Sequence, residues 1–282
     1  MTALGRLSRL VSGILGHSGA MNSPNVHAAR TDASTQIAPG PTATAQPFLL
    51  TEEQIRDRAA LSRLVLDINS NGGTYHELNL TPDLHIEGDY DMRRYVDVYA
   101  ISENLSGLKV LDVGTAAGYF ALECARRGAD VMAIDIWDSP PVRDIARYAA
   151  RRVTYVKKSL YELDASFGQF DIVICGSVLL HLPDLLGAIR ALRTVCRGCL
   201  CISTACTADS GQSDRPTCDF IALKGEDGDY YTYWLVSEAA LRRMLLIGGF
   251  VRVANESHFT LTTNEGRHQF STPHVVMTGF VH

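Results

Sequence analysis

Residues 108–120 of the sequence read as a buried strand that runs directly into a glycine-containing turn and a helix. The strand contains Val110, Leu111 and Val113, and the turn spans 112–118. A second apolar strand, residues 131–135, follows at the distance of one strand–helix–strand unit and ends in Asp135. In an open α/β sheet this order places backbone amides near a nucleotide and a carboxylate near its ribose. The stretch therefore predicts a nucleotide site.

The composition of the turn favours one kind of nucleotide. A dinucleotide site needs three glycines in G-x-G-x-x-G, so that a pyrophosphate can sit on the helix N-terminus. This turn has only Gly114 and Gly118, and Asp112 precedes Gly114 by two positions. A carboxylate there repels a pyrophosphate but attracts the ammonium and sulfonium groups of S-adenosylmethionine. We expect S-adenosylmethionine rather than NAD, with a turn that binds no ligand as a further alternative.

Composition and charge limit the partners. The 282 residues, 46% of them hydrophobic, can form one substantial core or one core with a small appendage. The formal net charge of -5 argues against strong electrostatic binding of nucleic acid. The sequence contains no apolar run near the roughly 18 residues that a membrane span requires. We expect a cytoplasmic protein with a small-molecule substrate and no membrane partner; nucleic acid is the less favoured partner, and the oligomeric state cannot be read from the sequence.

The seven cysteines do not indicate a metal site. Cys196 and Cys199 form a C-x-x-C pair, but no second pair and no H-x-x-x-H follows at zinc spacing. Cys199 and Cys201 alternate along an apparent strand, so buried reduced thiols are the expectation.

The chain divides into a flexible tail (1–48), an N-terminal cap region (49–104) and the nucleotide-binding domain (105–282). Small residues and proline dominate the tail, for which a transit peptide or a start codon misplaced upstream of Met21 are alternatives. In the cap, a capping box at Thr51–Gln54 predicts the start of a helix that ends at 71–73.

The rest of the cap and the domain follow from apolar patterning. We expect a strand or turn at 75–80, a loop through Gly88 and a helix at 92–104. After Asp135, helices and strands alternate, which argues for a parallel sheet with helices on both faces: helices 141–151 and 185–196, and strands 153–156, 170–175 and 199–204. Then come a polar loop (205–230), a helix capped by Ser237 (238–247) and an antiparallel hairpin of strands 251–253 and 275–281.

Together these segments resemble the class I S-adenosylmethionine-dependent methyltransferases. Within that family the chain looks most like the branch of tRNA wobble-uridine carboxymethyltransferases and related small-molecule enzymes. The similar pieces are Tyr75-His76 with Gly88, then 110–118, 127–129 with 133–135, 177–181 with 183–184, 233–237 and 249–250. The resemblance implies a Rossmann-like sheet of seven mostly parallel strands with a helical N-terminal cap.

The resemblance also implies cofactor-binding roles. It places Asp112 near the ammonium group, Asp135 on the ribose hydroxyls and Ile136 on the adenine. The complete implied set is Asp112, Gly114, Thr115, Ala116, Gly118, Asp135, Ile136, Leu160, Tyr161, Gly176 and Ser177.

Two departures bear on the cofactor. In the carboxymethyl-transferring relatives a Tyr and an Arg flank the histidine after the fourth strand, whereas here Leu180 and Leu182 flank His181. Those relatives also have an upstream lysine, and this sequence has none before Tyr75. A buried carboxylate without a cationic partner is costly. We therefore expect ordinary S-adenosylmethionine and simple methyl transfer.

Methyl transfer from a sulfonium is an in-line displacement, and a base helps when the nucleophile is a hydroxyl or an amine. His181 is the first candidate base and His76 the second, although either can have a purely structural role. Tyr75, Tyr233 and Trp234 are candidate substrate contacts, with core packing as the alternative for the last two. An O or N atom of a small molecule is the expected acceptor; an RNA-modifying enzyme and a non-catalytic S-adenosylmethionine-binding protein remain alternatives.

Overall fold

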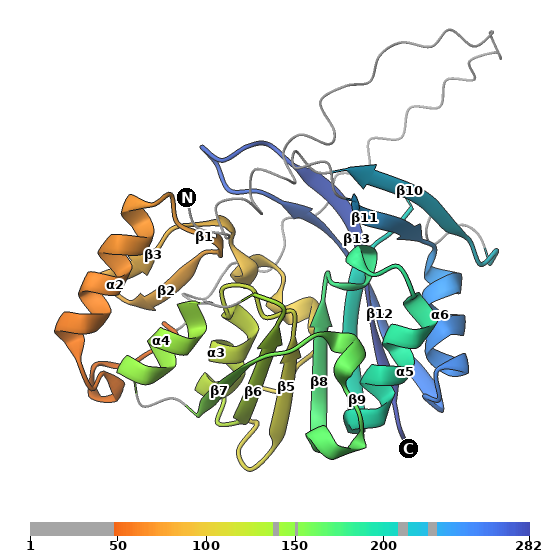
Figure 1. The fold of residues 1–282 in the computed structure, drawn as a ribbon, viewed down its shortest axis with the longest axis horizontal. Coiled ribbons are helices and arrows are strands. Elements are labelled where there is room, and N and C mark those ends of the chain that lie inside the picture. The colour runs from red at the N-terminus through yellow and green to blue at the C-terminus, as the bar shows by residue number, and fades with distance from the viewer. Residues whose placement is uncertain (1–47, 138–140, 150–151, 208–213, 225–229) are drawn as a thin grey trace, which may run out of the picture.

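A seven-stranded sheet forms the centre of the computed structural model, which describes residues 48–137, 141–149, 152–207, 214–224 and 230–282. The strand order is β12-β13-β9-β8-β5-β6-β7 (Figure 1). Strands β5 to β9 run parallel, and β13 pairs antiparallel with both β9 and β12. This confirms the expected fold class. The bounds are β5 Lys109–Val113, β6 Asp130–Asp135, β7 Val153–Lys157, β8 Phe170–Gly176, β9 Cys196–Ala205, β12 Arg252–Thr262 and β13 Ser271–Phe280.

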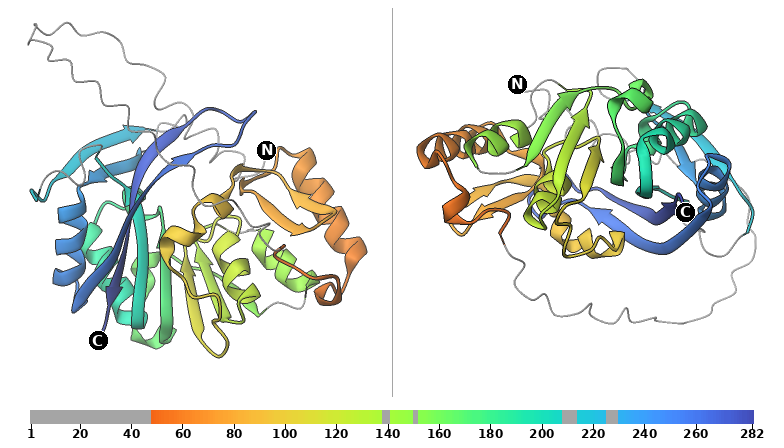
Figure 2. Two further views of the ribbon diagram at one scale, coloured as in Figure 1. Left: turned by 180° about the vertical axis from the view of Figure 1, so that it is seen from behind. Right: turned by 90° about the horizontal axis from the view of Figure 1, so that it is seen from below.

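Helices cover both faces of the sheet because successive strand residues point to opposite sides. Leu111 and Val173 pack in one apolar cluster with α5 and α6, whereas Val110 and Ile174 pack in the other with α3 and α4. Figure 2 shows this arrangement from two further sides. The helices are α3 Tyr119–Arg126, α4 Pro141–Tyr148, α5 Leu185–Val195 and α6 Glu238–Ile247.

The first helix of the cap, α2 (Arg58–Ser70), begins later than the sequence predicts. Its N-cap is Asp57, whose side chain accepts a hydrogen bond from the Ala60 nitrogen at 2.9 Å. The capping box at Thr51 instead closes the single 3-10 turn η1 (Glu52–Gln54). Ile55 then has extended backbone and bridges to Ala149, so the helix cannot continue through it. The expected tail lies outside the described residues apart from Phe48.

Four short strands follow α2 in two pairs: β1 Thr74–His76 with β4 Gly88–Tyr90, and β2 Leu78–Thr81 with β3 Leu84–Ile86. Gly88 therefore belongs to a strand, and the predicted loop there is wrong. The reason is close pairing: a Cβ at Gly88 would lie 2.1 Å from the Glu77 nitrogen.

The predicted helix at 92–104 is also wrong. Two 3-10 turns, η2 (Met92–Arg94) and η3 (Val96–Tyr99), occupy its first half. They end at Ala100, which has the left-handed φ of 51°. The Tyr99 hydroxyl lies 2.7 Å from Ser203 Oγ on β9, so a contact with the sheet competes with helical hydrogen bonding.

Part of the predicted loop at 205–230 is a strand. Strand β10 (Cys218–Lys224) pairs antiparallel with β11 (Tyr230–Val236), and Cys206 forms a bridge with Val236. Aromatic and β-branched residues in β11 favour this pairing. This hairpin and the cap lie at opposite ends of the sheet (Figures 1 and 2). Ser237 caps α6 as predicted, accepting a hydrogen bond from the Ala240 nitrogen.

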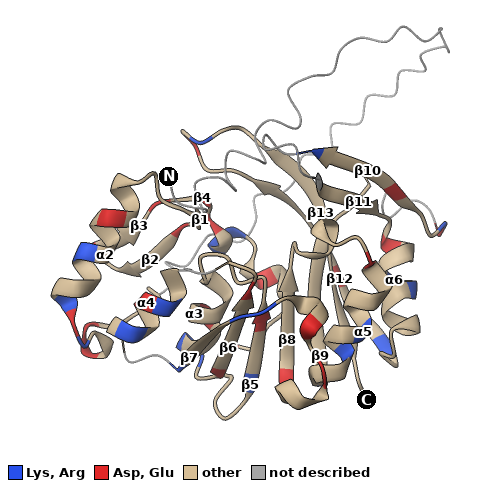
Figure 3. Ribbon diagram, in the orientation of Figure 1, with Lys and Arg blue, Asp and Glu red and all other residues tan. Residues whose placement is uncertain are grey.

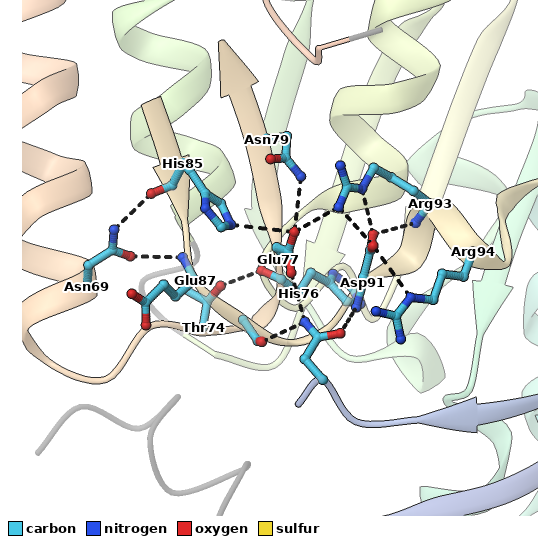
Figure 4. Close-up of polar contacts among 12 residues, drawn as sticks. Asn69, Thr74, His76, Glu77, Asn79, His85, Glu87, Asp91, Arg93 and Arg94 are labelled. Atoms are coloured by element: carbon cyan, nitrogen blue, oxygen red, sulfur yellow. Dashed lines mark hydrogen bonds and ion pairs between the residues drawn. The ribbon is translucent and has the colours of Figure 1, made fainter. Parts of the chain in front are cut away.

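The connection between β12 and β13 contacts the cap through Asn264. Its Nδ2 donates to Glu77 Oε2 at 2.8 Å and to the Gly88 carbonyl at 3.0 Å. Its Oδ1 accepts from the Asp91 nitrogen at 3.2 Å. Glu77 also accepts from Arg93, as Figure 4 shows. The connection between β12 and β13 is thus hydrogen-bonded directly to the cap.

Candidate functional site

The turn after β5 requires left-handed backbone at three positions. Gly114, Ala116 and Gly118 have φ values of 69°, 47° and 95°. Side chains would also collide at the two glycines, since a Cβ would lie 2.3 Å from Val178 Cγ2 at Gly114 and 2.2 Å from Val142 Cβ at Gly118. Glycine adopts this left-handed conformation readily, but the Cβ of Ala116 disfavours it, so the backbone at Ala116 carries strain of roughly 1 kcal/mol.

The turn faces the loop after β8 at the point where the strand order reverses. Strand β5 has β6 on one side and β8 on the other, and open α/β sheets bind ligands beyond the carboxyl ends of such strands. Ser177, the residue after β8, has a φ of 53°. Its nitrogen donates to Ser203 Oγ at 3.1 Å, which fixes this loop against β9.

Asp112 is buried beneath the turn, with 3% of its surface exposed. Thr115 Oγ1 donates to its Oδ2 at 2.7 Å. Burial, with a smaller contribution from the charge of Asp135, raises the pKa of Asp112 to about 7. The ionised carboxylate lies in surroundings of low polarity, where it attracts a cationic ligand group strongly.

Asp135 lies at the tip of β6 and contacts the same turn. Its carboxylate accepts hydrogen bonds from the backbone nitrogens of Ala116 at 2.9 Å and Ile136 at 2.7 Å. Burial raises the pKa of Asp135 above its ordinary value. The adjacent Ile136 side chain is 56% exposed. The strand tip therefore presents a carboxylate beside an accessible apolar surface.

Leu160 and Tyr161 lie in the 3-10 turn η4 (Leu160–Glu162) and differ in exposure. Leu160 is buried in the core on the side of α5, whereas Tyr161 is 41% exposed. The Tyr161 hydroxyl donates to the Asp184 carbonyl at 3.0 Å. Of the two, Tyr161 offers the larger surface to a ligand ring.

A small cavity of about 20 Å³ lies at the carboxyl ends of β5 and β8. It is large enough for a single water-sized molecule. It brings together residues that the sequence analysis placed in the site from three separate segments: Tyr75, His76, Asp112, Gly114, Thr115, Gly176 and Ser177. Met92, Tyr99, Phe120 and Leu261 complete its lining.

A second cavity of about 420 Å³ lies among the turn η6 (Leu179–His181), the β10–β11 hairpin and the start of β13. His181 is part of its lining. Tyr75, Ser177 and Leu261 line both cavities, so the two spaces are adjacent.

The orientation of His181 is fixed by a backbone carbonyl. Its Nδ1 lies 2.9 Å from the Tyr231 oxygen, and its ring packs on the Tyr231 ring with centroids 4.3 Å apart. A carbonyl oxygen can only accept, so Nδ1 carries the proton and Nε2 holds the lone pair. Burial lowers the pKa of His181 to about 4. The ring is therefore neutral at physiological pH.

His76 lies in the small cavity but is absent from the lining of the large one. Its side chain is buried, and its Nδ1 has no hydrogen-bond partner within the described parts of the chain. Burial lowers its pKa to about 3. The two histidines named from the sequence thus line different cavities.

Tyr75 lines both cavities, but Tyr233 and Trp234 line neither of them. The Trp234 ring packs on Phe220, with centroids 5.0 Å apart, and against the core cluster of α5 and α6. Tyr231 lines the large cavity instead. The sequence analysis missed it, and the aromatic run of β11 was the signal that could have indicated a strand beside the site.

Other features narrow the chemistry of the described residues. Among them, no group of three or more His, Cys, Asp or Glu side chains is placed to hold a metal ion. Cys196 and Cys201 are buried on β9, and Cys199 is half-buried.

Basic residues lie on several elements, among them α2, α4, α5 and α6 (Figure 3). In the ranges that the structure covers, no helix is long and apolar enough to span a membrane.

The reversal point, the glycine turn and the two acids at adjacent strand tips define a Rossmann-like methyltransferase fold of class I. A family model described as a methyltransferase domain matches residues 84–254. This match covers more than half of the chain, and the chain belongs to that family. The class predicted from the sequence, the S-adenosylmethionine-dependent methyltransferases, is confirmed.

Curated relatives share part of this domain. The chain is 39% identical to a ubiquinone biosynthesis O-methyltransferase of Acinetobacter baylyi over 97 residues, which cover 32% of this chain and 40% of the relative. It is 37% identical to the enzyme of the same name from Xanthomonas campestris over 116 residues, 39% of this chain and 48% of the relative. The chain thus spans less than half the length of these relatives.

A solved structure, the N-terminal domain of EvdMO1 with S-adenosylhomocysteine bound, resembles the fold. The TM-score is 0.55 at 16% identity, covering 81% of this chain and 98% of that one. At this identity the likeness concerns the fold alone.

Proposed function

We propose that the protein transfers the methyl group of S-adenosylmethionine to an oxygen or nitrogen atom of a small molecule. The observation that carries this proposal is the adjacency of the two cavities. The lining of one contains Asp112 and Gly114, and the lining of the other contains His181. Tyr75, Ser177 and Leu261 line both, so we expect the methyl donor and the acceptor atom to meet beside these side chains.

The residues around the turn fit the cofactor chemically. Asp112 suits its ammonium group, and Asp135 with the exposed Ile136 suits the ribose and adenine. Gly114 and Gly118 allow the left-handed backbone of the turn and its close packing on Val178 and Val142, which holds the turn at the carboxyl end of β5. Gly176 and Ser177 belong on the side of the methionine that faces the acceptor. Tyr161, with its hydroxyl fixed on Asp184, suits the adenine edge better than the buried Leu160.

When bound, S-adenosylmethionine supplies an electrophilic methyl group on a positively charged sulfur. The apolar walls of the large cavity exclude water from the acceptor and restrict its orientation. His181 Nε2 accepts the proton of the nucleophile, because its ring is neutral and Tyr231 fixes its orientation. The products are the methylated acceptor, S-adenosylhomocysteine and a proton.

Two observations favour a small-molecule acceptor. The curated relatives are named ubiquinone biosynthesis O-methyltransferases, which is consistent with an oxygen acceptor. The basic residues of α2 and α4 lie at one side of the described molecule and those of α5 and α6 at the other, with acidic residues interspersed (Figure 3). A nucleic-acid surface needs one continuous basic patch.

Isothermal titration with S-adenosylmethionine, S-adenosylhomocysteine and NAD tests the cofactor. We expect binding of the two adenosyl ligands and none of NAD; the reverse would refute the proposal. Transfer of labelled methyl groups to hydroxylated aromatic compounds, amines and tRNA then tests the acceptor. Label on tRNA alone would replace the small-molecule acceptor by RNA, and adenosyl binding without any transfer would indicate a non-catalytic protein.

A further inference from the structure

The lining of the large cavity contains no Asp, Glu, Lys or Arg among the described residues. Aliphatic and aromatic side chains dominate it, including Leu180, Ile221, Leu223 and Leu235. A charged group in this space would lose its hydration without gaining an ionic partner, which is costly. The volume of about 420 Å³ is in the range of pockets that bind small organic ligands. The cavity therefore suits an uncharged, largely apolar molecule.

His274, on β13, is a second histidine in this lining, and the methyl-transfer proposal gives it no role. It is 2% exposed and is held between β9 and β12, where it pairs with Ala205 and Phe259. The Phe259 ring stacks on it with centroids 5.1 Å apart. Such a ring has little freedom to reorient.

The hydrogen bond of His274 determines which nitrogen can bind a ligand. Its Nδ1 lies 3.0 Å from the Thr272 carbonyl, so Nδ1 donates and Nε2 keeps its lone pair. His181 has the same arrangement with Tyr231. Within the described residues, the two Nε2 atoms make no hydrogen bond. Burial lowers the pKa of His274 to about 4, so both rings are acceptors at neutral pH.

We propose that His274 binds the acceptor substrate: its Nε2 accepts a hydrogen bond from a second hydroxyl or amine group of an uncharged ring compound. His181 contacts the first such group, the one that is methylated. The inference rests on the proposed function, because it assigns the large cavity to the methyl acceptor. It narrows the substrate class to neutral, mainly apolar molecules with two donor groups.

The test compares catechol, phenol and benzoate as probes, titrated into protein saturated with S-adenosylhomocysteine and followed by ligand-observed NMR. Catechol should bind about tenfold more tightly than phenol, the size of one further hydrogen bond to a buried acceptor. Benzoate should bind more weakly than phenol. Failure of both neutral probes to bind, or equal binding of benzoate, overturns the inference.

Variants assign the preference to His274. In His274→Phe the preference for catechol should disappear while phenol binding changes less than about threefold, since only the acceptor is lost. His274→Gln, which keeps an oxygen acceptor, should retain part of the preference and guards against misfolding of the Phe variant. His258→Gln, at a half-exposed histidine of β12 paired with Glu238, is the matched control. A catechol preference that persists in both His274 variants overturns the inference.

The two proposals fail in different ways. A catechol preference that depends on His274, without methyl transfer to any acceptor, refutes the proposed function and leaves the binding role of His274. Methyl transfer with rates and KM values that do not respond to His274→Phe supports the function and refutes the role of His274.

Discussion

The Oδ2 atom of Asp135 accepts a hydrogen bond from the backbone nitrogen of Ala116, 2.9 Å away. This bond joins the tip of β6 to the turn after β5. The acid proposed to bind the ribose therefore also stabilises the turn proposed to receive the methionine part of the cofactor. We therefore expect a substitution at Asp135 to affect both ligand binding and the turn.

Two substitutions separate these effects. Asp135→Asn keeps one oxygen acceptor and turns its NH2 group toward the other backbone donor, so it should weaken S-adenosylmethionine binding at least about tenfold and cost less stability than removal of the whole carboxylate. Asp135→Ala leaves two backbone donors without their acceptor and should also lower the free energy of unfolding by about 1–3 kcal/mol. Calorimetric titration and urea denaturation measure the two quantities. Equal stability of the two variants would show that the Asp135 carboxylate does not stabilise the turn after β5.

The affinity for S-adenosylmethionine should depend on the ionisation of Asp112. Because burial raises the pKa of Asp112 to about 7, its charged form becomes scarce below neutrality. We expect affinity to fall about tenfold between pH 8 and pH 6. Calorimetric titrations at both pH values measure the affinity. The Asp112→Asn variant is the control, because its remaining pH dependence comes from ionisation of the ligand itself. A pH dependence that is the same in the variant would argue against contact with Asp112.

His181→Ala should lower kcat by about 10²- to 10⁴-fold while leaving S-adenosylmethionine affinity unchanged, because only the proton acceptor is removed. Since burial lowers the pKa of His181 to about 4, the wild-type kcat should not fall with the ordinary histidine pKa near 6.5. Steady-state rates from pH 5 to pH 8 test both statements. Unchanged turnover in the variant would remove His181 as the base.

The turn after β5 offers a pair of opposite substitutions. Gly118→Ala should lower the free energy of unfolding by about 2 kcal/mol or more, because the left-handed backbone and Val142 both oppose a side chain. Ala116→Gly should raise it by up to about 1 kcal/mol, since it relieves strain. Urea denaturation of both variants measures the difference. Similar effects at the two positions would contradict this description of the turn.

Acid should destabilise the protein in part through His76. Burial lowers its pKa to about 3 in the folded state, so between that pH and about 6.5 only the unfolded chain binds the proton. This contribution to stability is present above pH 6.5 and is lost as the pH falls toward 3. Between pH 6 and pH 5, the free energy of unfolding of His76→Phe should therefore fall by about 1 kcal/mol less than that of the wild type. Parallel denaturation curves at the two pH values provide the measurement.

Local signals account for the parts of the fold that the sequence predicted correctly. Apolar runs followed by a turn define β5 and β8, and the Ser237 cap defines the start of α6. The errors arise where distant contacts decide the backbone. Tyr99 lies in a segment with helical spacing, but its hydroxyl contacts Ser203 on β9 and the next residue turns left-handed. Strand β10 pairs with β11 in a separate two-stranded sheet, a partner that the local sequence of β10 does not indicate.

The candidate site shows the same division. Asp112, Gly114 and Asp135 belong to one continuous pattern, and the structure places them around one turn. Tyr231 and His274 carry no comparable signal, because their positions depend on strand pairing far along the chain. Which nitrogen of His181 keeps its lone pair also depends on a carbonyl contributed by Tyr231. No motif around His181 contains that information.

Asn264 donates a hydrogen bond to Glu77 across 187 positions of the chain. During synthesis on the ribosome, the cap strands therefore emerge long before the residue that fastens them to the C-terminal hairpin. Contacts between such distant segments form slowly because a long loop must close first. The contact between the cap and the β12–β13 connection is thus completed at a late stage of biogenesis, and a nascent chain that stops before Asn264 keeps the Gly88 carbonyl and the Glu77 carboxylate without this partner.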